Sequence, residues 1–170
     1  LQITGVGKAP SNGLRNGAIV NIEAAVKSIS AAIESAEMMA GHDVLSVYTA
    51  IGGAQVSSTN SKGIVGVAGN GKGSQEITQR DIDRVLEAAK AVPIDMARQI
   101  IHVIPQTYTI DNQKGIKKPL NMIGVRLEAE VHIVTAAVTS VQNLVRCIDR
   151  AGFGVEDIRL KTLAAAESIT

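Results

Sequence analysis

The chain has 170 residues, enough for one domain or two small subdomains. Its 17 basic and 16 acidic side chains give a formal charge of +1, and aromatic residues make up only 2%. The chain therefore has no broad positive electrostatic field to attract phosphate backbones and few aromatic side chains on which bases could stack. Nucleic acid is not an expected partner. The single cysteine, Cys147, cannot form an internal disulfide, which favours a reducing compartment.

Targeting and membrane signals are missing from the sequence. No apolar run approaches the roughly 18 residues of a membrane span, and no signal-peptide pattern opens the chain. The sequence begins at Leu1 without a methionine, as expected of a trimmed fragment.

The first 41 residues contain the clearest helix signal. Leu1–Gly7 is a short apolar segment that predicts a strand end, and a turn-rich loop follows over Lys8–Gly17. Apolar residues then recur at spacings of three and four from residue 22 to 40. Asn21 is suited to cap the start of this helix and Gly41 its end.

The next segment mixes strand and helix signals. Residues 44–51 are rich in β-branched side chains and predict a strand. Residues 54–60 and 63–68 predict a hairpin joined at Ser61, Lys62 and Gly63. Thr78, followed by Asp81, resembles a capping box and opens a predicted helix.

The second half of the chain is β-rich. Residues 98–110 predict an edge or kinked strand, because Pro105 cannot donate to a ladder. The longest strand signal lies over residues 123–135, where polar residues alternate with Val125, Leu127, Ala129, Val131 and Ile133. A helix follows from about residue 138, ended by Gly152, and residues 155–163 predict a last strand. The two layers are expected to join by two crossings, near Gly53 and near Val134, as when one block is inserted within another.

A glycine-rich loop invites a nucleotide-binding interpretation. Gly66–Gly73 nearly matches the phosphate-binding pattern G-x4-G-K-[ST], but Gly73 replaces the Ser or Thr and the next helix starts only near Thr78. We therefore interpret it as a loop between a hairpin and a helix. The alternative, an enzyme that binds a nucleotide through this loop and Lys72, stays open.

No group of side chains forms a convincing catalytic or metal-binding set. His102 and His132 lie on predicted strands without a cluster of ligands at metal-binding spacing. Cys147 lies on an apolar helical face and is expected to be a buried, inert thiol. Glu128 and Glu130 lie on one strand face and, with Arg126 beside them, suggest a solvated charged stripe more than an acid–base pair. We expect no catalytic, cofactor-binding or metal residues in this chain.

The polar loop over residues 111–119 is the candidate contact site. It carries the apolar Ile116 among charged residues, and an exposed apolar residue ringed by lysines suits a protein contact. A solvated turn is the alternative. The residues assigned to this contact are Asp111, Gln113, Gly115, Ile116 and Lys117.

Several runs of sequence closely resemble the FtsA family of bacterial cell-division proteins. They occur in the family's order and spacing and cover most of the chain, and HVIPQ and GVRLEAEVHIVT are their most specific parts. The runs are NGLRNGAIVNIEAAVKSI (Asn12–Ile29), AIESAEMMAG (Ala32–Gly41), HVIPQTYTIDNQKGIKKP (His102–Pro119), GVRLEAEVHIVT (Gly124–Thr135) and VQNLVRCIDRAG (Val141–Gly152).

The resemblance implies a mixed α/β (α+β) fold. Residues 1–52 and 133–170 would be part of the actin-like, ribonuclease H-like subdomain 1A. Residues 53–132 would form the inserted SHS2-type subdomain 1C. A PilM-type pilus-assembly scaffold, also actin-like, is an alternative that the two specific runs argue against.

The resemblance also implies a function for the whole protein. It would bind ATP and magnesium, polymerise, recruit late division proteins such as FtsN, and hold the FtsZ ring at the inner face of the cell membrane at the septum. The phosphate loops are expected before Leu1 and after Thr170, and the FtsZ-binding lobe and the membrane helix are likewise expected outside this chain. For the chain itself, the resemblance implies contact with other proteins and self-association. It implies neither a bound cofactor nor catalysis.

Overall fold

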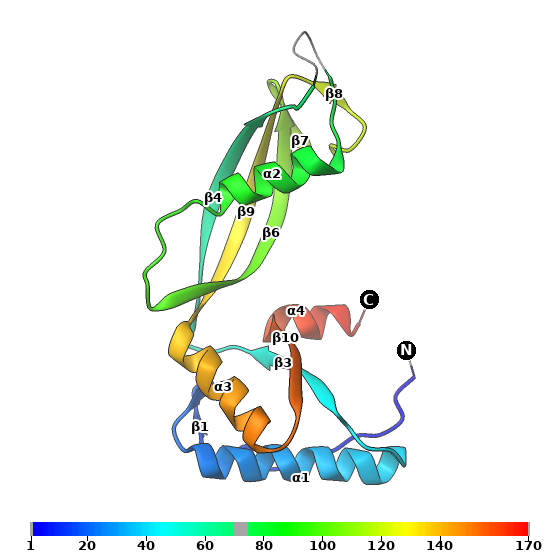
Figure 1. Ribbon diagram of the computed structural model, residues 1–170, viewed down its shortest axis with the longest axis vertical. Coiled ribbons are helices and arrows are strands. Elements are labelled where there is room, and N and C mark those ends of the chain that lie inside the picture. Colours follow the sequence, from blue (N-terminus) through cyan, green and yellow to red (C-terminus); the bar gives the residue numbers. More distant parts are fainter. Residues whose placement is uncertain (1, 70–74, 170) are drawn as a thin grey trace. The chain divides into compact units, whose positions relative to one another are not determined.

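The computed structural model describes residues 2–69 and 75–169, and the chain separates into two compact units. The first unit comprises the chain up to Val56, Ala97–Gln99 and the chain from Ala136 onward. The second comprises Ser57–Met96 and Ile100–Thr135. Figure 1 shows the elements of both units.

The first unit combines helices with a small parallel sheet. Strands β3 and β10 pair in parallel, with Gly154 opposite Ser46 and Leu160 opposite Ile51. Its described elements are β1 (Leu14–Arg15), β2 (Ala18–Ile19), α1 (Ile22–Ala40), β3 (Ser46–Ile51), α3 (Val138–Arg150), β10 (Gly154–Leu160) and α4 (Lys161–Glu167).

Helix α1 has the caps that its sequence predicts. The side chain of Asn21 accepts a hydrogen bond from the Ala24 amide at 3.0 Å. At the other end Gly41 has φ 76°, and its amide donates to the Glu37 carbonyl at 2.8 Å. A left-handed residue at this position is favourable for glycine because it has no Cβ. Both predicted helix boundaries are confirmed.

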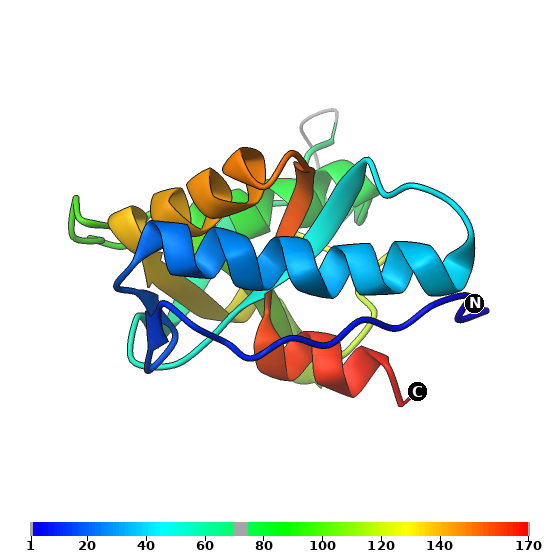
Figure 2. The same ribbon diagram turned by 90° about the horizontal axis from the view of Figure 1, so that it is seen from below.

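Residues 2–11, which precede β1, pair with no strand. Residues 2–11 form neither helix nor strand, so a strand end does not occur in this part of the predicted segment. Figure 2 shows the segment running along α1. A Cβ atom on Gly7 would lie 1.7 Å from the Ala32 carbonyl oxygen, so the backbone approaches the helix too closely for a side chain. The glycines Gly5 and Gly7 therefore let the backbone of this segment lie against α1 instead of entering a sheet.

The last predicted strand is shorter than its sequence suggested. β10 ends at Leu160, and Lys161–Glu167 forms the helix α4. This run, KTLAAAE, contains three alanines, which have the highest helix propensity. The prediction of a strand through residue 163 is therefore wrong at its end.

The second unit is a four-stranded sheet with one helix packed on it, in the order β4-β9-β6-β7. A separate pair, β5 and β8, is antiparallel. The elements are β4 (Val56–Gly66), β5 (Gln75–Glu76), α2 (Gln79–Ala89), β6 (Arg98–Ile110), β7 (Gln113–Ile116), β8 (Ile123–Gly124) and β9 (Arg126–Ala137) (Figure 1).

The predicted hairpin over residues 54–68 is wrong, because β4 runs through it as one strand. Gly63 does not turn the chain. A Cβ atom there would lie 2.1 Å from the Val85 carbonyl oxygen and 2.7 Å from the Ala89 nitrogen, so glycine lets α2 lie directly against β4. The Ser61 hydroxyl adds a hydrogen bond of 2.7 Å to the Ala89 carbonyl of the same helix.

Strand β6 lies inside the sheet, between β9 and β7, and is not an edge strand as predicted. It tolerates Pro105 because β7 pairs with it only further along, with Tyr108 opposite Ile116 and Ile110 opposite Gln113. Pro105 therefore lies on a part of β6 beside which β7 has already ended. The strand itself is confirmed over its predicted residues 98–110.

The alternation predicted for residues 123–135 is confirmed in β9. Leu127, Ala129 and Ile133 are fully buried, whereas Val125 precedes the strand and is 57% exposed, so its predicted burial is wrong. Helix α2 supplies the other side of this core. The buried core residues are Ile77, Ile82, Val85, Ala89, Tyr108, Ile110, Ile116, Leu127, Ala129, Val131 and Ile133.

Candidate functional site

The predicted contact residues lie on the turn from β6 to β7, on β7 itself and, for Lys117, directly after β7. Asp111 has φ 53° and an exposed side chain. One of its carboxylate oxygens accepts hydrogen bonds from the amides of Val125 and Arg126, both at 3.0 Å. Aspartate is one of the few residues that tolerate the left-handed conformation. Asp111 thus fixes this turn against the start of β9.

The prediction that Ile116 is an exposed apolar anchor is wrong. Its exposed fraction is only 8%, and it belongs to the core that α2 covers. Ile116 pairs with Tyr108 across β6 and β7, so its side chain points to the same face as that buried ring. Gln113, Gly115 and Lys117 are exposed as predicted. An apolar anchor for a contact here must therefore come from other residues.

The phosphate-loop interpretation falls mostly on residues outside those described. Gly66 ends β4, but residues 70–74, which include Lys72 and Gly73, are not among the described residues. The helix after the loop, α2, begins at Gln79 and has the capping box that its sequence predicts. The side chains of Thr78 and Asp81 therefore accept hydrogen bonds from each other's backbone amides at the N-terminal end of α2, where a bound phosphate would lie.

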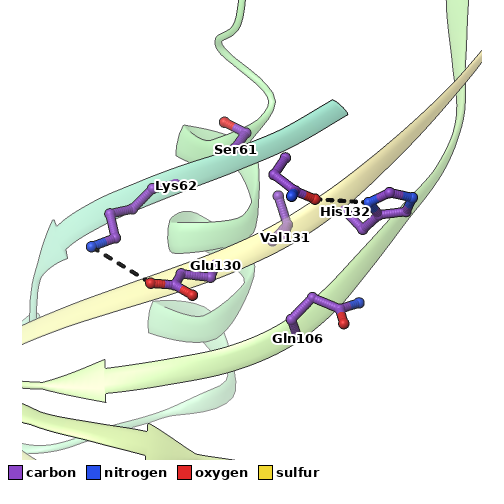
Figure 3. A pocket seen from close by; sticks show the side chains of 7 residues that line it. Ser61, Lys62, Gln106, Glu130, Val131 and His132 are labelled. Atoms are coloured by element: carbon purple, nitrogen blue, oxygen red, sulfur yellow. Dashed lines mark hydrogen bonds and ion pairs between the residues drawn. The ribbon is translucent and has the colours of Figure 1, made fainter. Parts of the chain in front are cut away.

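A cavity of the second unit lies on the sheet face turned away from α2. Ser61 bonds to α2, so its neighbours Asn60 and Lys62 point the other way, because side chains alternate along a strand. A cavity of about 450 Å³ is lined there by Asn60, Ser61, Lys62, Gln106, Glu130, Val131 and His132 (Figure 3).

The polar groups of this cavity bind one another across the strands. His132 Nδ1 lies 2.8 Å from the side-chain oxygen of Asn60, and Lys62 Nζ lies 3.8 Å from Glu130 (Figure 3). Further along the chain from Asn60, the Val67 amide donates to the Val125 carbonyl at 2.8 Å. Residue numbers therefore rise along β4 as they fall along β9, and the two strands are antiparallel. The polar groups of this face thus pair with one another from strand to strand.

Glu128 is the most strongly held carboxylate of this face. It lies 3.1 Å from Lys62 Nζ and 2.8 Å from Arg126 Nη2, with only 11% of its side chain exposed. Glu130, the next residue of β9 on the same face, has 57% of its side chain exposed. The long apolar stems of Lys62 and Arg126 can cover Glu128 while their charged ends stay in water. The predicted solvated stripe is therefore solvated at Glu130 but covered at Glu128.

Replacing Glu128 by glutamine is expected to lower the free energy of unfolding by about 1 kcal/mol, because two cations lose a nearly buried partner. Urea denaturation followed by circular dichroism measures the change. The matched control is Glu130→Gln, for which we expect less than about 0.5 kcal/mol, since that ion pair is exposed and longer. Equal effects of the two substitutions would contradict this interpretation of Glu128.

The remaining candidates have structural surroundings. Cys147 is fully buried, as predicted. Burial raises the pKa of its thiol, and the charge of Arg150 only partly opposes this. His102 is half-buried on β6 and His132 on β9. Among the residues described, no three His, Cys, Asp or Glu side chains are grouped so as to hold a metal ion.

Comparisons with known proteins bear on which family the chain belongs to. A model of the SHS2 domain inserted in FtsA matches residues 53–135. The cell division protein FtsA of Borreliella burgdorferi is 48% identical over 98% of this chain, and FtsA of Pseudomonas aeruginosa is 46% identical over 99%. FtsA of Escherichia coli K12 is 37% identical over 99%. The chain belongs to the FtsA family. It spans about two fifths of the length of these relatives, 40%, 39% and 39% respectively.

A solved structure agrees on the FtsA-type fold. A chain of the PilM-PilN type IV pilus biogenesis complex superposes with a TM-score of 0.60, covering 95% of this chain and 40% of that one. Its identity of 15% makes this a likeness of fold alone. The fold is mixed α/β, part of an actin-like fold with an SHS2 subdomain, as predicted. No helix in the described part of this FtsA-family chain is both long and apolar enough to cross a membrane.

The cavity of Figure 3 was not predicted as a unit. The sequence predicts a turn at Lys62 and indicates no role for Asn60 or Gln106. A period-2 pattern through Asn60, Lys62 and Ile64 could have indicated one continuous strand with a polar face. The pairing of that face with Glu128 and Glu130 depends on strand order, which local sequence does not specify.

Proposed function

We propose that this chain is the part of a bacterial cell-division scaffold that makes protein contacts. The observation that carries the proposal is the 48% identity to a cell division protein across 98% of the chain. The whole protein would bind ATP and magnesium between two lobes, polymerise, hold the FtsZ ring at the inner membrane face of the septum and recruit late division proteins such as FtsN. The paired carboxylates Glu128 and Glu130 support contact more than catalysis.

The two compact units support an inserted arrangement. We propose that residues 1–52 and 133–170 belong to subdomain 1A and that residues 53–132 form subdomain 1C. The SHS2 match over residues 53–135 and the second unit, which spans Ser57–Met96 and Ile100–Thr135, both support these limits. The second unit starts at Ser57 and ends at Thr135, and Ala97–Gln99 belong to the first unit.

We propose that the exposed residues of the predicted loop, Asp111, Gln113, Gly115 and Lys117, serve this contact. Ile116 is not part of the surface, because it is buried. The loop projects from a sheet that the core holds in place, and Asp111 fixes its start through two amides. Loops held by a scaffold are suited to recognition because their side chains are free to vary while their backbone stays fixed.

A chimera tests the proposed function. The 170 residues replace the matching segment of the Pseudomonas aeruginosa protein, and septum formation is measured in cells depleted of their own copy. We expect the chimera to support division and Lys117→Glu to reduce recruitment of late division proteins. The control Arg80→Glu makes the same change of charge at an exposed position on α2.

Two outcomes would contradict this proposal. A chimera that accumulates in folded form but never supports division would count against the scaffold role. Micromolar binding of ATP and magnesium by the 170-residue chain, abolished by Lys72→Ala, would favour the nucleotide-binding enzyme instead.

A further inference from the structure

Strand β4 forms one edge of the four-stranded sheet of the second unit. Within the described sheet its neighbour is β9 on one side only (Figure 1). The strand has 11 residues, whereas strands of about five or six residues are the most common. A long edge strand presents a row of backbone N–H and C=O groups to which another strand can bind.

The pairing of β4 with β9 determines which backbone groups of β4 point outward. The Val67 amide donates to the Val125 carbonyl, and the Thr135 hydroxyl donates to the Ser57 carbonyl. Equal numbers of residues separate these two pairs on both strands, so Ser57 and Val67 both turn their backbone groups toward β9. In an antiparallel pair, such residues alternate with residues whose N–H and C=O groups point away from the partner strand. The outward residues in the middle of β4 are all exposed and are Ser58, Asn60, Lys62 and Ile64.

Contacts within the chain occupy the two ends of this outward row. The Val56 amide donates to the Gly53 carbonyl at 3.2 Å, and the Gly66 carbonyl accepts from Arg84 Nη1 at 3.2 Å. Between these ends, no hydrogen bond from outside the ladder reaches the outward backbone groups within the described part of the chain. We call these outward groups the β4 edge; they belong to Ser58, Asn60, Lys62 and Ile64.

The β4 edge lacks the usual protection against strand addition. Exposed edges are commonly blocked by a proline, a bulge or a free lysine. β4 contains no proline, and its one charged residue, Lys62, lies 3.1 Å from Glu128 and 3.8 Å from Glu130. Both carboxylates belong to β9, so they draw the ammonium group over the sheet and away from the edge.

We propose that the β4 edge binds an extended segment of another protein, which adds to the sheet as a further strand. This contact deepens the proposed contact function and rests on it. Only a backbone in strand conformation offers donors and acceptors at the spacing of the four outward residues. The segment should carry an apolar side chain opposite Ile64, which is 48% exposed, because apolar cross-strand pairs stabilise a sheet.

A second copy of this chain fits the β4 edge less well. In a symmetric antiparallel pair of two β4 strands centred on Ser61, Ile64 of one copy faces Ser58 of the other. Asn60 then faces Lys62. Each Ile64 would be left without an apolar neighbour, whereas a partner of different sequence can supply one.

Proline at an outward position tests the β4 edge without breaking the ladder to β9. The Ser58 amide points away from β9, so Ser58→Pro removes an outward donor at a position where proline is tolerated. The probe is a short synthetic peptide of alternating threonine and valine with a lysine at each end, a composition that favours a strand. In the 170-residue chain, followed by NMR, the peptide should protect the amides of the β4 edge from hydrogen exchange.

Ser58→Pro should weaken peptide binding about tenfold, because it removes one hydrogen bond and its ring blocks the approach of the added strand. The matched control Ser58→Ala keeps the amide and should bind the peptide as the unmodified chain does. Ile64→Ser keeps every backbone group and decides the question if the proline variant does not fold. It should weaken binding about threefold through loss of the apolar pair.

Three results would overturn this proposal. The first is protection of the β4-edge amides in the chain without peptide, which would mean that the edge is already covered. The second is equal peptide binding by folded Ser58→Pro and Ser58→Ala. The third is a dimer in sedimentation equilibrium that Ser58→Pro abolishes, which would make a second copy the occupant.

The chimera separates this contact from the scaffold role. If the unmodified chimera supports division and its Ser58→Pro variant recruits late division proteins equally well, the β4 edge is not the contact surface and only the present proposal is wrong. If the unmodified chimera fails while the peptide still binds the β4 edge, the scaffold role alone is rejected.

Discussion

Replacing Asp81 by alanine is expected to lower the free energy of unfolding of the second unit by about 3 kcal/mol. Asp81 is fully buried. One oxygen accepts from the Ala68 amide at 3.0 Å and the other from the Thr78 amide and hydroxyl at 3.0 and 2.8 Å. Arg84 Nη1 lies 3.2 Å from the first oxygen. Alanine would leave these donors without their partner and remove one half of the capping box of α2.

Asp83 provides the matched control on the same helix. It is exposed, and among the described residues its carboxylate accepts a hydrogen bond only from the side chain of Gln79, at 2.9 Å. Asp83→Ala should therefore cost less than about 0.5 kcal/mol. Hydrogen exchange of the amides of α2 and β4 locates the loss, and urea denaturation gives its size. Equal effects at the two positions would show that Asp81 has no special role.

The same carboxylate should make the second unit sensitive to acid. Burial raises the pKa of Asp81, but hydrogen bonds from Thr78 and Ala68 and the charge of Arg84 outweigh it and hold the pKa below its ordinary value of 3.8. A lowered folded-state pKa contributes stability that is complete above 3.8 and is lost as the pH falls through the folded value. Asp81→Asn, which does not titrate there, should show a shallower loss of stability below pH 3.8. Identical acid profiles would contradict this assignment.

Local signals were sufficient wherever a residue acts on its own helix. Asn21 and Gly41 cap α1, and Thr78 with Asp81 caps α2, because caps depend on groups within four residues. The alternation in β9 also survived, since a strand with one buried face must repeat every second residue. Spacing and residue type are therefore enough to predict these features.

The predictions that failed required knowledge of partners distant in sequence. Ile116 is surrounded by charged residues in sequence, yet β7 pairs with β6 and turns its side chain into the core. The exposure at the end of α1 was missed for the same reason. Met38 and Met39 continue an apolar helix and suggest a core, and only the packed structure shows that they are 81% and 65% exposed.

Replacing Gly63 by alanine is the other change expected to have a large effect. It should lower the free energy of unfolding by about 3 kcal/mol, the upper end of the usual range for an overpacked site. The new Cβ atom would lie 2.1 Å from the Val85 carbonyl oxygen and 2.7 Å from the Ala89 nitrogen. Both are backbone atoms of α2, so no side chain can rotate to relieve the overlap. The helix would have to move away from β4, which would also stretch the bond from Ser61 to the Ala89 carbonyl.

Gly66 supplies the control within the same strand. A Cβ atom there would meet nothing within 4 Å, so Gly66→Ala should be neutral or slightly stabilising, because alanine loses less backbone entropy than glycine on folding. Urea denaturation of the two variants compares the sites directly. If Gly63→Ala were as stable as Gly66→Ala, the close approach of α2 to β4 would be wrong. A turn at Ser61–Gly63, which the sequence alone suggested, would then have to be considered again.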